Sequence, residues 1–233
     1  MVKATEKRIY LTRHAQAEHN VAEDYTIHDA PLTALGRQQA ANLHKDTKET
    51  IQQTAELLVT SGLKRTLTTT AIGYATLTLR KRLEEQGKGV VVLPQLQECN
   101  DLPCDTGSPR EVLEADPEYA GIDFSTLTPD WTSKAGFYAA TSSALKARAR
   151  WNRRWLRERP ERDIVLVAHG DCLRYITDGE NSFKPWANVE VREYTFKVED
   201  EEDTDGDAWL VEVKKVVQEG ADLPTSSSER FSA

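Results

Sequence analysis

The stretch that decides the predicted fold is Arg8-Ile9-Tyr10-Leu11-Thr12, which is followed directly by Arg13 and His14. Ile9 and Leu11 lie two residues apart, and this spacing of apolar residues is typical of a short β-strand. The strand therefore delivers an arginine and a histidine to its carboxyl end. Open α/β sheets bind ligands at that end of their strands, so Arg13 and His14 are the first candidates for a functional site.

Three more segments are predicted as core strands. An apolar run over residues 163–168 ends at His169-Gly170, and shorter runs cover residues 56–60 and 90–93. Helical stretches separate these runs. The order strand, helix, strand, helix, strand, long insertion, strand is typical of a doubly wound sheet. The sequence therefore predicts an α/β fold with a mostly parallel sheet.

Three helices are predicted between these strands. The first has Thr33 as its N-cap and turns three apolar residues toward the sheet, namely Leu35, Ala40 and Leu43. The second begins at Ser61 as its N-cap and continues through residue 71. The third covers residues 142 to about 159 and ends before Pro160, because proline cannot continue a helix.

The chain is predicted to form one domain over residues 1–218. Residues 99–141 are rich in Pro, Gly, Asp and Thr and are too many for a simple connection. We therefore expect this segment to form a partly helical cap over the carboxyl ends of the strands. Two edge strands are predicted at residues 191–198 and 209–217, with an acidic loop between them. The polar, Ser-rich residues 219–233 are predicted to be disordered.

Composition narrows the class of protein. Hydrophobic residues make up 39% of the 233 residues and charged residues 29%, which predicts a globular rather than a disordered chain. The net charge of -8 argues against partners such as nucleic acid or a membrane surface, because both attract basic proteins. The first eight residues have no apolar core long enough for a signal peptide, and no later apolar run could span a bilayer, so we expect a cytoplasmic protein. Three cysteines without CxxC spacing predict neither disulfides nor a zinc site.

Each core strand is followed by a residue that can bind or protonate an anion. Parallel strands point their carboxyl ends the same way, so we expect five side chains to converge: Arg13, His14, Arg65, Glu98 and His169. Phosphoryl transfer uses such a set. Arginine forks bind phosphate oxygens, a neutral imidazole attacks phosphorus, and a carboxylic acid protonates the leaving alkoxide. Three nearby residues are alternatives to Glu98 as that acid: Glu18, Asp101 and Asp105.

Residues 11–20, Leu-Thr-Arg-His-Ala-Gln-Ala-Glu-His-Asn, resemble the RHG-type signature of the histidine phosphatase superfamily, in its phosphoglycerate-mutase-like branch. Further blocks match the family in its order: residues 31–36 (Pro-Leu-Thr-Ala-Leu-Gly), 61–65 (Ser-Gly-Leu-Lys-Arg) with Thr69, 96–98 (Leu-Gln-Glu) and 167–170 (Val-Ala-His-Gly). The ordered series makes the resemblance specific, whereas any single block would be weak. The segment Leu-Pro-Cys-Asp-Thr-Gly at 102–107 is similar to a fungal group of mutase-like proteins.

The resemblance implies a three-layer α/β/α sandwich and a chemistry that uses no metal or other cofactor. It implies that His14 is the phosphorylated nucleophile and Glu98 the proton donor. It also implies that four side chains bind the phosphate: Arg13, Asn20, Arg65 and His169. The family usually has glycine after the nucleophile, where this chain has Ala15. A glycine there would serve a positive φ or a close backbone approach to phosphate, so the alanine leaves reduced activity open.

The predicted function is metal-independent hydrolysis of a small phosphorylated metabolite through a phosphohistidine intermediate. A phosphoglycerate mutase would use the same site, but residues 21–30 lack the Gly-Trp pair that true mutases carry before the Pro-Leu-Thr block. A phospho-ligand-binding regulator that has lost turnover is a third alternative. Selectivity is expected in the cap, where three residues are candidate substrate contacts: Asp105, Arg110 and Trp131.

The predicted helix near residue 150 is strongly basic. Residues 146–159 hold seven basic residues and one acid, Glu158, interleaved with Trp151 and Trp155. Such a composition is found in nucleic-acid-binding patches. The negative net charge favours a solvated helix face instead, with the tryptophans packed inward and the basic residues paired with the acidic loop near Glu201.

Overall fold

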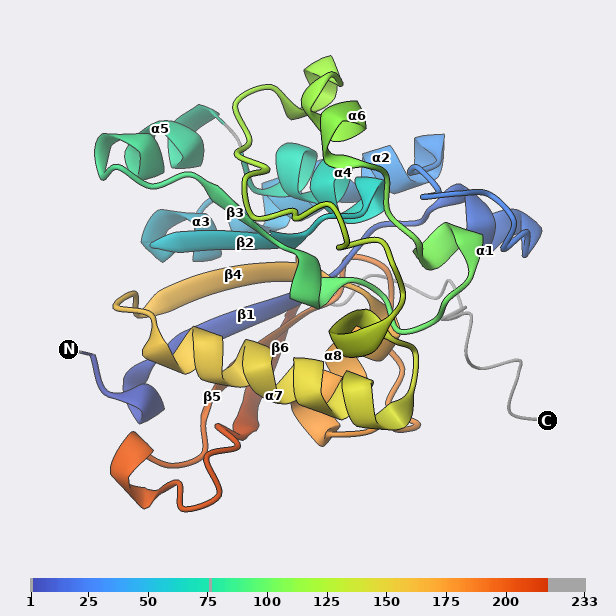
Figure 1. The fold of residues 1–233 in the computed structure, drawn as a ribbon. Coiled ribbons are helices and arrows are strands. Elements are labelled where there is room, and N and C mark those ends of the chain that lie inside the picture. Colours follow the sequence, from blue (N-terminus) through green and yellow to red (C-terminus); the bar gives the residue numbers. More distant parts are fainter. Residues whose placement is uncertain (1, 76, 218–233) are drawn as a thin grey trace.

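The computed structural model describes residues 2–75 and 77–217. Its six strands form one sheet in the order β3-β2-β4-β1-β5-β6 (Figure 1). The strands are β1 (Arg8–Arg13), β2 (Leu57–Ser61), β3 (Val90–Leu93), β4 (Asp163–Ala168), β5 (Val191–Phe196) and β6 (Leu210–Val217). The first four are parallel, and β5 runs antiparallel to both β1 and β6. The mostly parallel sheet confirms the predicted fold class.

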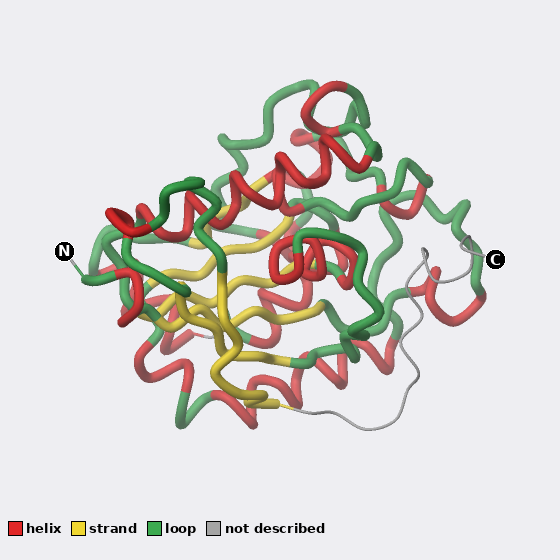
Figure 2. The backbone as a smooth tube through the Cα atoms, turned by 90° about the horizontal axis from the view of Figure 1, so that it is seen from below, coloured by secondary structure: helices red, strands yellow, loops and turns green. Residues whose placement is uncertain are grey.

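Helices cover both faces of this sheet and complete the three predicted layers (Figure 1). One face carries α2 (Ala34–Thr47), α3 (Ile51–Thr54), α4 (Lys64–Gly73) and α5 (Leu77–Glu85). The other carries α7 (Ser142–Glu158) and α8 (Gly170–Asp178). Figure 2 shows the strands from below, in yellow, with the helices around them in red. Within the described ranges, no helix combines the length and the apolar character needed to cross a membrane.

The side chains of β1 show why this strand is central. Ile9 and Leu11 pack in one apolar cluster with Leu156 of α7. Tyr10 points to the opposite face and packs in a second cluster with Leu43 of α2. Because both faces of β1 are buried, its carboxyl end is held from two sides.

Two details of the predicted helices are wrong. Thr33 caps α2 as predicted, because its hydroxyl accepts the N–H of Gly36, but Leu35 is 48% exposed. The buried stripe of α2 follows Gly36, Ala40 and Leu43, and residue 35 does not fall on it. Ser61 is no N-cap: it is the last residue of β2, and α4 begins at Lys64 with Leu63 as its N-cap.

The predicted edge strands are partly confirmed. β6 lies at one edge of the sheet, whereas β5 lies inside it, between β1 and β6. The opposite edge is β3. The predicted disorder of residues 219–233 falls outside the described residues.

Residues 99–141 contain one short helix, α6 (Arg110–Glu114), and three 3-10 turns, η3 (Pro103–Asp105), η4 (Pro117–Tyr119) and η5 (Gly136–Tyr138). We call this segment the cap. The buried Trp131 packs in a cluster with Leu67 of α4, which ties the cap to the helical layer. The remaining elements are α1 (Glu18–Ala22) and the 3-10 turns η1 (Ala4–Glu6), η2 (Pro94–Leu96) and η6 (Asp200–Glu202).

The basic helix α7 pairs with the acidic loop, as predicted. Arg157 forms ion pairs with Asp200, at 2.8 Å, and with Asp203, and Arg150 lies 3.0 Å from a carboxylate oxygen of Asp207. Trp151 and Trp155 are half-buried against the core, and their rings stack with centroids 6.3 Å apart.

Candidate active site

The register of β1 and β4 places two histidines side by side. Arg13 and Ala168 are paired across the two parallel strands, so His14 and His169 each lie one residue beyond a matched position. The backbone N–H of His14 donates to the carbonyl of Ala168 at 3.0 Å. The two imidazole centroids are 5.2 Å apart. The expected convergence at the strand ends is therefore present for this pair.

Hydrogen bonds set the tautomer of His14. Its Nδ1 lies 2.7 Å from the carbonyl oxygen of Ala15, which can only accept, so Nδ1 carries the proton. Nε2 is then the unprotonated ring nitrogen, and its lone pair accepts the Nε–H of Arg65 at 3.3 Å. Burial, followed by the charges of Arg65 and Arg13, lowers the pKa of His14 well below its usual value. The imidazole is therefore neutral at physiological pH, as a nucleophile must be.

The alanine after His14 fits its place. Ala15 is fully buried, and its φ lies outside the left-handed region that would require glycine. Its N–H donates to the hydroxyl of Thr69 at 3.0 Å, and the His14 carbonyl accepts the side-chain amide of Asn188 at 3.0 Å. The backbone around His14 is thus held without strain at Ala15.

Arg65 joins the strand ends to the cap. Its Nε–H points at both histidines, 3.3 Å from His14 Nε2 and 3.2 Å from His169 Nδ1. Its Nη1 donates to the carbonyl of Cys104 at 2.6 Å, and its Nη2 forms an ion pair with Asp105 at 2.9 Å. We expected the guanidinium of Arg65 to face phosphate, but in this structure both of its Nη groups are bonded to the cap.

Arg13 and His169 complete what we call the cradle, defined as Arg13, His14, Arg65 and His169. Arg13 Nη1 donates to the carbonyl of Trp186, and its Nε lies 3.6 Å from the position that a Cβ on Gly170 would take. His169 Nε2 lies 2.9 Å from the hydroxyl of Ser61 at the end of β2. Burial and the charge of Arg65 lower the pKa of His169 well below its usual value, so this imidazole is neutral as well.

Glu98 has the surroundings of a general acid. Its Oε1 accepts two backbone N–H groups, from Cys99 at 2.9 Å and from Cys172 in the first turn of α8 at 3.1 Å. Burial, followed by the charges of Asp171 and Asp105, raises the pKa of Glu98 to about 7. A carboxyl group with this pKa can both give and take a proton at neutral pH.

The alternative acids fit less well. Glu18 and Asp101 are exposed to solvent. Asp105 is buried, but its carboxylate is paired with Arg65. The geometry therefore favours Glu98 among the predicted candidates.

The other predicted site residues, Asn20 and the three cap residues, differ in whether they lie near the cradle. The side chain of Asn20 accepts the N–H of Ala17 and bonds to His19 Nε2, each at 3.1 Å, so its phosphate contact stays a prediction. Arg110 is exposed and pairs with Glu114 one turn further along α6. Trp131 is buried in the core of the cap. Asp105 alone of the three predicted cap contacts reaches the cradle.

Three residues near the cradle were missed by the sequence analysis as site residues: Ser61, Lys134 and Asp171. Ser61 bonds to His169, Lys134 Nζ donates to the carbonyl of Glu98 at 3.1 Å, and Asp171 contributes to the raised pKa of Glu98. Ser61 ends a core strand and Asp171 follows His169-Gly170, so the strand-end argument would have found both. Lys134 lies in irregular chain and carries no such signal.

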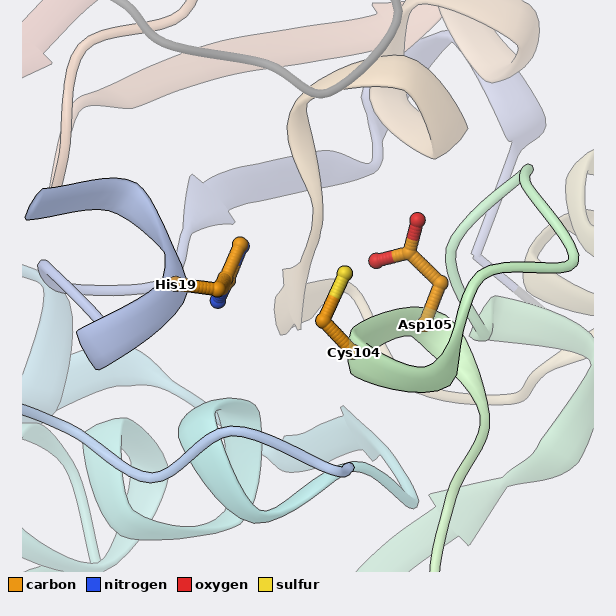
Figure 3. Close-up of side chains that lie close together, drawn as sticks. All are labelled: His19, Cys104 and Asp105. Atoms are coloured by element: carbon orange, nitrogen blue, oxygen red, sulfur yellow. The ribbon is translucent and has the colours of Figure 1, made fainter. Parts of the chain in front are cut away.

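One cluster of possible metal ligands borders the cradle. His19, Cys104 and Asp105 point toward a common space, and one candidate ligand atom of each lies within 4.8 Å of the others (Figure 3). Asp105 is already paired with Arg65. Burial raises the pKa of the Cys104 thiol to about 12. Burial and the charges of Arg65 and Arg13 lower the pKa of His19 to about 2, and the same positive potential opposes a metal cation. The pairing of Asp105 and the nearby arginine charges therefore disfavour a metal ion at this cluster.

The site is closed to solvent. Relative exposure is 2% for His14 and 0% for His169, and the other residues of the cradle and Glu98 are also buried. The cap contacts with Arg65 lie directly on the cradle. The side chains of the cradle and Glu98 are therefore shielded from solvent in this structure.

A model for branch 1 of the histidine phosphatase superfamily matches residues 9–187. The chain belongs to this superfamily. The matched range runs from β1 past α8 and contains the cradle and Glu98. This histidine phosphatase is 29% identical over 206 residues to a protein from Schizosaccharomyces pombe named a probable phosphatase, with 82% of this chain and 92% of the relative covered.

Other relatives support the mutase-like branch. Phosphoglycerate mutase-like protein 1 of Arabidopsis thaliana is 27% identical over 262 residues, which covers 95% of this chain and 91% of that protein. The resemblance read from the motifs is thereby confirmed. The chain is a phosphatase of the histidine phosphatase type.

Solved structures share the fold. A mycobacterial glucosyl-3-phosphoglycerate phosphatase in complex with VO3 superimposes with a TM-score of 0.53 at 21% identity, covering 88% of this chain and 97% of that one. A phosphoserine phosphatase from Entamoeba histolytica in complex with 3-phosphoglyceric acid gives a TM-score of 0.55 at 18% identity, with 91% and 97% covered. At these identities the likeness concerns the fold.

Proposed function

We propose that this protein is a metal-independent phosphomonoesterase that hydrolyses a small phosphorylated metabolite through a phosphohistidine at His14. The observation that carries the proposal is the pairing of a neutral His14, whose Nε2 is unprotonated and faces Arg65, with a buried Glu98 whose pKa is raised to about 7. The names of the relatives, a phosphatase and mutase-like proteins, agree with phosphoryl chemistry at this site.

In the first step the Nε2 lone pair of His14 forms a bond to phosphorus and the bond from phosphorus to the ester oxygen breaks. Glu98 gives its proton to the departing alkoxide, which leaves as an alcohol. Arg13 and Arg65 provide positive charge for the equatorial phosphate oxygens in the transition state. His169 Nδ1 accepts the Nε–H of Arg65 at 3.2 Å, whereas the two Nη groups of Arg65 contact the cap.

In the second step the Glu98 carboxylate takes a proton from water while the water oxygen bonds to phosphorus. The bond between phosphorus and His14 Nε2 then breaks, which releases inorganic phosphate and leaves Glu98 protonated for the next cycle. A carboxyl group whose pKa is near 7 serves both steps, because neither protonation state is rare at neutral pH.

Hydrolysis of 4-nitrophenyl phosphate in the presence of EDTA tests the proposal. The protein should hydrolyse this ester, and His14→Ala should lower kcat by at least about 10³-fold because the nucleophile is lost. The exposed His28 provides a matched control, and His28→Ala should keep full activity. Acid quenching with radiolabelled substrate should trap an acid-labile phosphoprotein in the parent chain and none in His14→Ala.

Three other outcomes would contradict it. Full activity of His14→Ala would exclude the phosphohistidine, and loss of parent activity with EDTA would exclude a metal-independent reaction. Isomerisation of phosphoglycerate with little release of phosphate would assign the site to a mutase.

A further inference from the structure

A third histidine is buried beside the cradle and takes no part in the phosphoryl transfer proposed above. His19 lies in α1, and only 3% of it is exposed. Its imidazole centroid is 6.4 Å from that of His14. Burial and the charges of Arg65 and Arg13 lower the pKa of His19 to about 2, so the ring is neutral at physiological pH. A neutral imidazole therefore lies within the positive potential of the cradle.

Asn20 sets the tautomer of this imidazole. The side-chain oxygen of Asn20 accepts the N–H of Ala17 at 3.1 Å, which identifies the other polar atom of the amide as its NH2 group. That NH2 group lies 3.1 Å from His19 Nε2. Because an amide NH2 group can only donate, Nε2 must accept, and the proton of the neutral ring is then on Nδ1. His19 Nδ1 is therefore a hydrogen-bond donor.

This donor has no acceptor among the described residues. The imidazole points into a space that it shares with Cys104 and Asp105, and one of its nitrogens lies within 4.8 Å of the thiol sulfur and of a carboxylate oxygen (Figure 3). The carboxylate is engaged elsewhere, because its two oxygens accept from Arg65 at 2.9 Å and from Asn100 at 3.3 Å. A buried donor without an acceptor is costly, so the Nδ1–H of His19 calls for a partner that binds from outside the chain.

The surrounding charge indicates which acceptor fits. The guanidinium groups of Arg13 and Arg65 both act on His19, and an anionic oxygen is stabilised in their potential far more than a neutral carbonyl is. A phosphoryl group at His14 Nε2 carries such oxygens. In-line attack begins with phosphorus about 3–3.5 Å from the nucleophile, and a hydrogen bond adds about 2.9 Å. One phosphoryl oxygen can therefore bridge two rings whose centroids are 6.4 Å apart.

We propose that His19 binds the phosphoryl group of the substrate through its Nδ1–H, and that Asn20 is a positioning residue that holds this tautomer. The inference rests on the proposed function, because the phosphoryl group must lie at His14. It also changes the role that the family motif implies for Asn20, whose amide acts on phosphate through the imidazole instead of contacting it. The same contact serves inorganic phosphate, the product of hydrolysis.

Binding of inorganic phosphate tests the contact without turnover. The dissociation constant, measured by calorimetry and as competitive inhibition of 4-nitrophenyl phosphate hydrolysis, should rise by about 10-fold or more in His19→Phe, which keeps a ring and loses the donor. His19→Asn should retain most of the affinity, because its amide NH2 group can replace Nδ1–H. KM should rise in His19→Phe more than kcat falls, since the contact is made in the ground state as well as in the transition state.

A matched control and the pH dependence separate this contact from a general effect. His28→Phe, at an exposed histidine, should change neither the phosphate affinity nor KM. Because the pKa of His19 is about 2, the ratio of the phosphate affinities of the parent protein and His19→Phe should stay constant from weakly acidic to weakly alkaline pH. A ratio that falls as the pH rises through the usual pKa of histidine would show a charged imidazole and overturn the neutral donor.

A double-mutant cycle tests the role of Asn20. Asn20→Ala should weaken phosphate binding in the parent protein and have little further effect in His19→Phe, because the donor that it positions is already lost. Nitrogen-15 NMR provides a readout that does not depend on activity. The histidine signals that disappear in His19→Phe should report the Nδ1–H tautomer in the parent protein and should shift toward the Nε2–H tautomer in Asn20→Ala.

The outcomes keep the two proposals apart. Unchanged phosphate affinity in a folded His19→Phe would overturn the contact, as would an Nε2–H tautomer of His19 in the parent protein, and the phosphatase mechanism would stand in both cases. Additive losses in the cycle would show that Asn20 contacts phosphate directly and overturn its positioning role. Should His19→Phe not fold, the tautomer and the phosphate affinity of His19→Asn decide the question. Failure of the parent protein to hydrolyse phosphate esters would overturn the proposed function, whereas the binding of inorganic phosphate would still test His19.

Discussion

The strand ends and the cap build the site in different ways. His14 and His169 follow paired positions of two adjacent parallel strands, so the backbone ladder of the sheet sets the distance between their rings. Asp105 ends the 3-10 turn η3 and Lys134 lies in irregular chain, and side-chain contacts with Arg65 and Glu98 bring them to the site. The sheet supplies the two histidines of the cradle, and the cap supplies groups around them.

We expect the strand ends and the cap to play different roles in the reaction. Groups fixed by a hydrogen-bonded sheet cannot move independently, which suits a nucleophile that must stay aligned. Asp105 and Lys134 reach the site through side-chain contacts with Arg65 and Glu98, which single substitutions can remove without changing the sheet. Variants on the two sides should therefore fail differently, with the chemistry affected in one case and binding and pH dependence in the other.

The largest expected effect concerns Glu98, which joins the two regions. Glu98→Gln should lower kcat/KM on an alkyl phosphate by about 10²-fold to 10⁴-fold, the usual contribution of a general acid. The loss on 4-nitrophenyl phosphate should be smaller, because nitrophenolate leaves without a proton. In the parent protein, kcat/KM on the alkyl ester should fall as the pH rises through about 7, because the raised pKa of Glu98 marks where the acid form is lost.

This limb of the pH profile should be absent in Glu98→Gln. Glu18→Gln, at an exposed residue that the sequence allowed as an alternative acid, should leave the profile unchanged. Equal losses on alkyl and aryl esters would show that another group protonates the alcohol.

An intermediate effect is expected where the cap holds the cradle. Asp105→Asn removes the charge partner of Arg65, and we expect KM for 4-nitrophenyl phosphate to rise by about 10-fold, the usual effect of breaking one charged hydrogen bond. The negative charge of Asp105 also helps to raise the pKa of Glu98. Without it that pKa falls, so the alkaline limb should move to lower pH.

Asp101→Asn, at an exposed neighbour, is the matched control and should change neither quantity. An unchanged pH profile and KM in Asp105→Asn would mean that the cradle does not depend on the cap, and the division of roles drawn above would be wrong.

The smallest effect is expected at the strand end itself. Ala15→Gly restores the residue that the family usually has after the nucleophile. Because Ala15 has no left-handed φ and its N–H is already bonded to Thr69, we expect kcat to change by less than about 3-fold. The added freedom of the unfolded chain should lower the free energy of unfolding by about 0.5–1 kcal/mol, measured by chemical denaturation. A large gain in kcat would show that the alanine restricts this phosphatase.

The sequence by itself determined the layers of the fold and the members of the cradle. Alternating and continuous apolar runs identify buried strands from local spacing alone, and the parallel arrangement of such strands requires their carboxyl ends to meet. Arg13, His14 and His169 could be predicted for that reason. The same local patterns failed at Leu35 and Ser61, where the exact start of a helix depends on which residues the neighbouring elements cover.

Only the tertiary structure decided the environment of these groups. The tautomer of His14, the raised pKa of Glu98 and the position of Lys134 depend on burial and on charges that are distant in the sequence. Electrostatic effects of this kind depend on distances through space and on the exclusion of water, and no local pattern of residues records either quantity. The residues of the cap follow no periodic pattern, so the contacts that the cap makes with the site could not be predicted from the sequence of this phosphatase.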